Sequence, residues 1–132
     1  MKIALTLVTI LAVWPFSSTK KYPMTAGANV PAATGTVMID KDKENGNTKV
    51  DVKVDHLADP SSLTPSASAY IVWVRPNGGD AVKQGALRVD KNLSGELKTQ
   101  TVSKSFDVLI TAENSESATF PSSVQVLSAH VN

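Results

Sequence analysis

Hydrophobic and polar positions alternate with a period of two along much of the chain, which predicts β-strands. The clearest case is KVDVKVDHL at Lys49–Leu57, where Val50, Val52 and Val54 share one face and lysines and aspartates share the other. We expect this strand to have one buried face and one face in water.

Ala69–Asp90, AYIVWVRPNGGDAVKQGALRVD, predicts two strands joined by a glycine-rich turn at Asn77-Gly78-Gly79. The first strand places Tyr70, Val72 and Val74 on one face and Ile71 and Trp73 on the other. A strand that is apolar on both faces belongs in the interior of a packed sheet.

Outside this hairpin, five runs have strand character, and Lys49–Leu57 is one of them. They are Thr36–Asp40, Lys49–Leu57, Glu96–Val102, Phe106–Ala112 and Val124–Val131. Asn45-Gly46 between the first two indicates a hairpin. Seven short, mainly antiparallel strands with turns at this spacing predict an all-β, immunoglobulin-like β-sandwich.

The alternation also predicts the core. The expected core residues are Val37, Ile39, Val50, Val52, Val54, Tyr70, Val72, Leu97, Phe106, Val108, Ile110, Val124 and Val126. A tryptophan on the third strand of a sandwich commonly lies over its centre, so we expect Trp73 to pack in this core or at its edge. Its alternative role, stacking on a ligand, is less favoured.

The N-terminus has the pattern of a secretory signal. Lys2 precedes an uncharged, mostly apolar run, Ile3–Phe16, which is shorter than a membrane span requires. We therefore interpret residues 1–19 as a signal-like segment and expect an extracytoplasmic protein. Cleavage near residues 17–19 and cleavage at Ala26-Gly27-Ala28 both remain open, and an uncleaved N-terminal anchor is a further alternative.

Residues 20–33, KKYPMTAGANVPAA, are polar and contain Pro23 and Pro31, which disfavour regular structure. We interpret them as a tether. The sandwich domain is then expected to cover residues 34–132, about 100 residues, a usual size for this fold.

Composition narrows the possible functions. The chain has no cysteine, which excludes disulfides, thiolate metal sites and cysteine nucleophiles. Its 13 basic and 12 acidic residues are balanced and form no basic run, so nothing predicts nucleic acid or an anionic membrane as a partner.

Catalytic and metal-binding patterns are also missing from the sequence. His56 and His130 are the two histidines, and neither has metal-ligand spacing. There is no G-x-S-x-G elbow and no glycine-rich phosphate loop. We predict a protein that is not an enzyme, with no catalytic, cofactor-binding or metal-binding residues.

Two local motifs have competing interpretations. Asp40, Asp42, Glu44, Gly46 and Asp51 superficially resemble a calcium loop, but the glycine is one position late, the last ligand is Asp, and lysines intervene. We favour a solvated hairpin whose Lys and Asp residues pair across strands.

The other motif is Asn92-Leu93-Ser94, which matches a glycosylation sequon. We interpret it as a turn.

The segment Tyr70–Pro76 with Gly78-Gly79, followed by Gln84–Leu87, Phe106–Val108 and Thr111–Glu113, resembles the C-terminal extracytoplasmic domain of anti-sigma-K factors. It also resembles small exported bacterial proteins that consist of that domain alone. The resemblance covers about half the chain, Ala69–Asn132, and its motifs are structural. It implies a sandwich fold and an extracytoplasmic location. It does not imply sigma-factor regulation, because the hydrophobic segment here is N-terminal, with no cytoplasmic helical segment before it.

Two functional classes follow from the sequence. One is a non-catalytic exported module that binds a protein, or is associated with the cell envelope, through its loops. The other is a structural subunit of a surface fibre or homo-oligomer, in which residues 20–33 or an edge strand join a neighbour's sheet. No ligand or partner can be named from the sequence.

Overall fold

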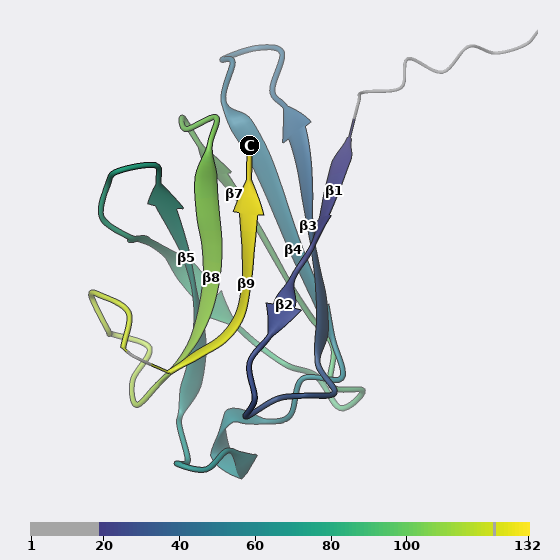
Figure 1. The fold of residues 1–132 in the computed structure, drawn as a ribbon, viewed down its shortest axis with the longest axis vertical. Coiled ribbons are helices and arrows are strands. Elements are labelled where there is room, and N and C mark those ends of the chain that lie inside the picture. The colour runs from purple at the N-terminus through teal and green to yellow at the C-terminus, as the bar shows by residue number, and fades with distance from the viewer. Residues whose placement is uncertain (1–18, 123) are drawn as a thin grey trace, which may run out of the picture.

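A computed structural model describes residues 19–122 and 124–132, and shows two antiparallel sheets packed face to face (Figure 1). The predicted β-sandwich is therefore confirmed. The apolar run of the predicted signal segment lies outside the described residues. Within the described ranges, no helix has the length and apolar character that crossing a membrane requires.

The described residues form nine strands. These are β1 (Lys20–Pro23), β2 (Thr25–Ala26), β3 (Thr34–Lys41), β4 (Thr48–Asp55), β5 (Ala69–Pro76), β6 (Val82–Leu87), β7 (Gly95–Thr101), β8 (Phe106–Glu113) and β9 (Gln125–Val131). One sheet has the order β1-β3-β4-β7, and the other has the order β2-β9-β8-β5-β6. A 3-10 turn, Pro60–Ser62, lies in the connection from β4 to β5.

All seven predicted strands are present close to their predicted bounds, as β3 to β9. The strand predicted to be interior is β5, which pairs with β6 on one side and β8 on the other. The predicted turns are also present, and Gly46 and Gly78 adopt φ values of 72° and 75°, which glycine tolerates at a tight reversal.

The space between the sheets is filled largely by the predicted residues. Ile39, Leu97 and Val124 are only partly buried, at the margin of this core. Further buried residues from loops and strands complete it: Val30, Ala33, Leu57, Leu63, Val74, Leu87, Ala112, Leu127 and Val131. Tyr70 is buried too, and its hydroxyl donates to the Ala58 carbonyl at 2.6 Å. Burial, with a smaller contribution from Asp59, raises the pKa of Tyr70 to about 12.

The interpretation of residues 20–33 as a tether is wrong. β1 pairs with β3 along four residues, and β2 pairs with β9 along two, so the segment joins both sheets. Val30 and Ala33 are buried in the core. Pro23 is compatible with this arrangement because β1 is an edge strand, where a missing N–H is tolerated.

The strand order of both sheets can be compared with that of immunoglobulin domains. The order β9-β8-β5-β6 corresponds to the G-F-C-C′ order of a variable-type sheet. In the other sheet, β4 lies between the consecutive strand β3 and the non-consecutive strand β7, as strand B of an immunoglobulin domain lies between strands A and E.

Candidate functional site

Trp73 packs on the outer face of the five-stranded sheet and not between the sheets. It is fully buried in a second apolar cluster with Ala69, Ile71 and Leu109. The expectation that it completes the main core is therefore wrong. The reason is its position in β5: it shares a face with Ile71, while the residues before and after it point into the sandwich.

The segment of residues 114–122, here called the covering loop, shields this cluster. Its Ala118 packs against the cluster, as do Ala81 and Ala86. Trp73 is consequently a structural residue whose burial depends on a loop distant in sequence.

A chain of buried polar contacts lies under the covering loop. Trp73 Nε1 donates to Thr111 Oγ1 at 2.8 Å, and the Thr111 hydroxyl donates to Glu113 Oε2. Ser122 N donates to the same carboxylate oxygen at 2.9 Å. These bonds join β5, β8 and the end of the covering loop.

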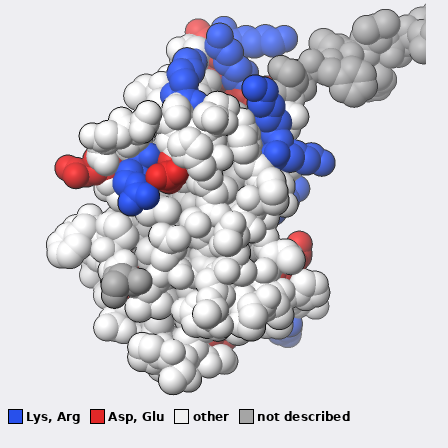
Figure 2. Space-filling view, viewed as in Figure 1, with Lys and Arg blue, Asp and Glu red and all other residues white. Residues whose placement is uncertain are grey.

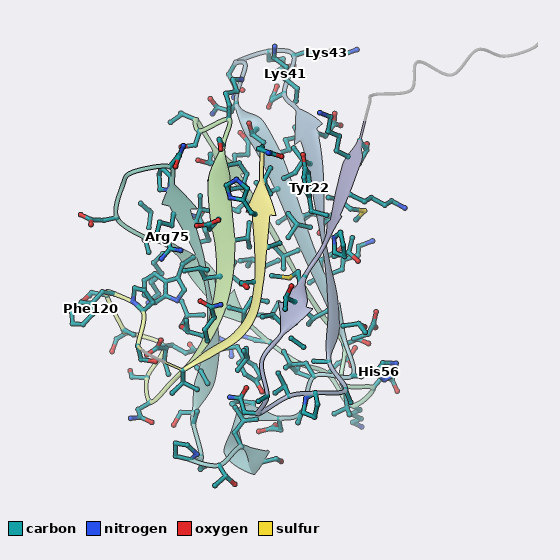
Figure 3. All side chains as sticks on the ribbon, viewed as in Figure 1. Tyr22, Lys41, Lys43, His56, Arg75 and Phe120 are labelled. Carbon is teal, nitrogen blue, oxygen red and sulfur yellow. The ribbon has the colours of Figure 1, made fainter. Side chains whose placement is uncertain are left out.

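The middle of the covering loop is attached at a second place. Glu116 forms an ion pair with Arg88 at 3.0 Å, and Lys83 Nζ donates to the Glu116 carbonyl. Between these attachments Phe120 projects from the molecule with 76% of its surface exposed (Figure 3). The loop therefore presents an aromatic side chain from a position anchored on both sides.

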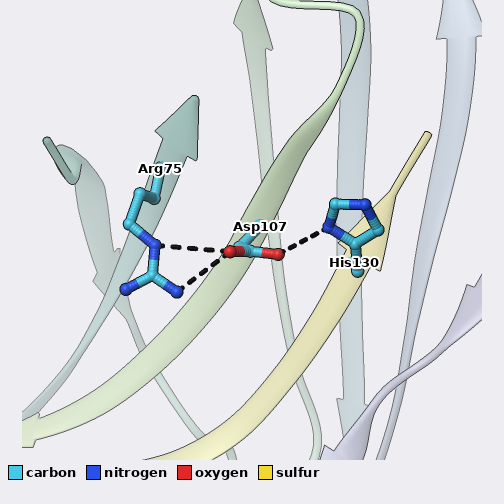
Figure 4. Close-up of polar contacts among 3 residues, drawn as sticks. All are labelled: Arg75, Asp107 and His130. Carbon is cyan, nitrogen blue, oxygen red and sulfur yellow. Dashed lines mark hydrogen bonds and ion pairs between the residues drawn. The ribbon is translucent and has the colours of Figure 1, made fainter. Parts of the chain in front are cut away.

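Further along the same sheet face, Asp107 on β8 lies between Arg75 on β5 and His130 on β9 (Figure 4). Arg75 Nη2 donates to Asp107 Oδ2 at 2.9 Å, and His130 Nδ1 lies 2.7 Å from Asp107 Oδ1. Partial burial raises the pKa of the Asp107 carboxyl, but its hydrogen bonds to His130 and Arg75 outweigh this effect and the net shift is downward.

The two histidines lie in different environments. His56 is exposed just after β4, with a φ of 55°, at the end of the molecule away from the β3–β4 hairpin (Figure 3). His130 is bonded to Asp107, as described above. Among residues 19–122 and 124–132, no group of three or more His, Asp or Glu side chains is placed to hold a metal.

The acidic residues of the calcium-like motif take part in local structure. Asp42 Oδ1 accepts from Glu44 N at 2.9 Å inside the hairpin turn, and Asp40 lies opposite Lys49 in the register of β3 and β4. Lysines, including Lys41 and Lys43, gather at this end of the molecule (Figure 2). The geometry matches the solvated hairpin.

Asp51 instead lies on the outer face of the four-stranded sheet, beside a hollow of about 460 Å³. Burial and the nearby Glu96 carboxylate raise the pKa of Asp51. Its Oδ1 is buried without a hydrogen-bond partner in the described part of the chain.

The sequon-like segment is a turn, as predicted. Asp90 Oδ1 accepts from Asn92 N and Ser94 N, and Leu93 has a φ of 61°.

Sequence comparison finds no known protein family whose model matches this chain, and no curated protein similar to it.

The sequence interpretation did not identify either polar group on the outer face of the five-stranded sheet. Thr111 and Glu113 are spaced by two in β8, and their shared face with Trp73 was the available signal. The contacts of Asp107 with Arg75 and His130 depend on which strands are neighbours, which alternation does not specify.

Proposed function

We propose that this chain is a non-catalytic, exported β-sandwich module that binds another protein through the covering loop. The observation that carries the proposal is Phe120, an aromatic side chain that is 76% exposed. Aromatic residues are enriched among the side chains that dominate binding energy at protein interfaces.

The attachment of the covering loop supports the same proposal. Glu113 holds its C-terminal end, and the Arg88–Glu116 ion pair holds its middle. A loop ordered before binding loses less conformational entropy when a partner docks.

Export and an extracytoplasmic location are proposed from the sequence, namely Lys2 and the apolar run Ile3–Phe16. The resemblance to the anti-sigma-K outer domain supports the same location.

A photo-crosslinking amino acid at position 120 tests the proposal in the native host. We expect a discrete adduct with another protein. Its mass should therefore be greater than that of the chain and different from twice that mass, which a second copy of the chain would give. Position 102 is the matched control, because Val102 is 78% exposed but lies outside the covering loop. No adduct at position 120, or equal adducts at both positions, would contradict the proposal.

The alternative proposal is a subunit of a fibre or homo-oligomer. The edge strand β7 favours this alternative. All seven of its residues pair with β4 without a bulge, and within the described residues β7 pairs with no other strand. Such an open edge can accept another strand. An adduct of twice the chain mass, formed from positions on β7 and not from position 120, would support this alternative.

A further inference from the structure

A small pocket opens beside the end of the covering loop. Its volume is about 270 Å³. Its lining includes the buried residues Ala112 and Glu113, and the exposed residues at its rim are Pro65, Ser66, Asn114 and Ser122. A pocket of this size is below the usual range for drug-sized ligands and suits a single side chain.

One of the buried lining residues, Glu113, has a carboxylate whose hydrogen-bond donors are neutral. Glu113 is 7% exposed, and its side chain accepts from the Thr111 hydroxyl and the Ser122 amide, both at Oε2. Within residues 19–122 and 124–132, no Lys, Arg or His forms an ion pair with it. Burying a carboxylate without a cation is unfavourable, so a cation that enters the pocket gains a strong electrostatic contact.

The exposed neighbour Glu116 provides a contrast. It pairs with Arg88, and Lys83 lies against its backbone carbonyl. Arg88 and Lys83 therefore bind Glu116, although the Glu113 carboxylate is the more deeply buried of the two.

Hydrogen bonds to backbone carbonyls hold the walls of the pocket. Ser68 N donates to the Glu113 carbonyl at 2.9 Å, and Ala112 N donates to the Val124 carbonyl at 2.9 Å. Ser122 Oγ donates to the Ala112 carbonyl at 3.3 Å. The pocket is thus formed before any ligand is bound.

We propose that this pocket accepts the primary ammonium group of a lysine side chain presented by the protein partner. This inference rests on the proposed function, since it names the chemistry of the partner at the covering loop. Lysine fits because its ammonium is a compact charge on a slender apolar stem, whereas a guanidinium is broad and planar. Phe120 is two residues from Ser122 and is free to contact the partner around the lysine.

The probe is the peptide acetyl-Gly-Lys-Gly-amide, followed by amide chemical shifts in the full exported chain. We expect saturable shifts at Ser66, Asn114 and Ser122. The same peptide with norleucine in place of lysine keeps the stem without the charge, and we expect it to bind at least about tenfold more weakly. An arginine peptide is expected to bind more weakly than the lysine peptide.

Glu113→Gln keeps the shape of the side chain and removes its charge, and we expect it to weaken lysine-peptide binding by about tenfold or more. Glu44→Gln, the same exchange at an exposed carboxylate in the β3–β4 hairpin, is the matched control and is expected to bind as the parent does. If Glu113→Gln does not fold, Ser66→Leu obstructs the rim without altering the bonds to Glu113, and loss of binding is expected.

Three results would overturn the inference: equal binding of the lysine and norleucine peptides, unchanged binding in the Glu113 or Ser66 variant, or no saturable shift. Its failure is separable from failure of the proposed function. An adduct at position 120 without lysine binding removes only the lysine assignment, while the absence of that adduct removes the docking surface itself.

Discussion

Thr111 is the residue through which the covering loop is connected to the sheet, since its hydroxyl accepts from Trp73 and donates to Glu113. All three side chains are buried. Removing the hydroxyl leaves a buried indole N–H without an acceptor and deprives the carboxylate of a donor.

We expect Thr111→Val to lower the free energy of unfolding by about 2 kcal/mol or more, because each buried polar group left unsatisfied costs about 1–3 kcal/mol. Chemical denaturation measures the change, and protease cleavage within residues 114–122 should become faster. Thr36→Val is the matched control. It is the same exchange on β3, and the Thr36 side chain forms no hydrogen bond with the described residues. Equal stability of the two variants would contradict the role assigned to Thr111.

Asp107 links three strands through charge, and its effect on stability should depend on pH. Its folded-state pKa lies below the unfolded value of about 3.9. The stabilisation is therefore present above the unfolded pKa and is lost as the pH falls through the folded pKa.

We expect Asp107→Asn to be less stable than the parent at neutral pH, and this difference to shrink between about pH 5 and about pH 2. Urea unfolding at several pH values measures it. Asp80→Asn, on the exposed β5–β6 turn, serves as the control and should follow the parent at every pH. A pH-independent difference for Asp107→Asn would show that charge is not the cause.

At the level of elements, β1 and β2 decide how the two sheets are closed on one side. β1 covers the edge of β3, and Tyr22, Met24 and Ala26 pack against the core. Tyr22 also donates its hydroxyl to the carbonyl of Asn132 at 2.8 Å.

A chain that begins at residue 27 should therefore have a lower urea midpoint than a chain that begins at residue 19. We also expect it to form larger species in size-exclusion chromatography, because the edge of β3 becomes available to other chains. If both chains were monomeric and had the same urea midpoint, β1 and β2 would contribute little to the stability of the fold. Deletion as far as residue 33 is less informative, since it also removes the buried Val30 and Ala33.

Strand positions were predictable because alternation is a local property of the chain. In β4 the three valines and the intervening charged residues directly indicate the two faces. Trp73 shows the limit of this reasoning. Its alternation with Tyr70 and Val72 correctly placed it on the opposite face, yet only the covering loop explains how that face is buried. Pro23 led to the wrong prediction of a tether. Proline disfavours interior strands but is accepted in an edge strand such as β1.

At the level of the whole molecule, the strand pairing bears on where an exported chain would be cleaved. Cleavage after Ala28 would remove β1 and β2 together, whereas cleavage near residues 17–19 would leave both in place. We expect the mature chain to begin between residues 18 and 20.

Intact-mass measurement of the protein recovered from the exported fraction tests this expectation. A chain starting at Asn29 would contradict it, and so would a full-length chain, which would instead support the uncleaved anchor. A Lys20→Ala variant is a useful control, because it preserves the apolar run and should be cleaved at the same place.

Fold class, seven of the strands, three turns and most of the core residues follow from the order of amino acids, since side-chain direction in a strand is set by position along the backbone. The pairing of residues 20–26, the burial of Trp73, the contacts of Asp107 and the pocket at Glu113 were decided by tertiary structure. Each depends on segments far apart in the chain, and a local pattern carries no information about which of them become neighbours.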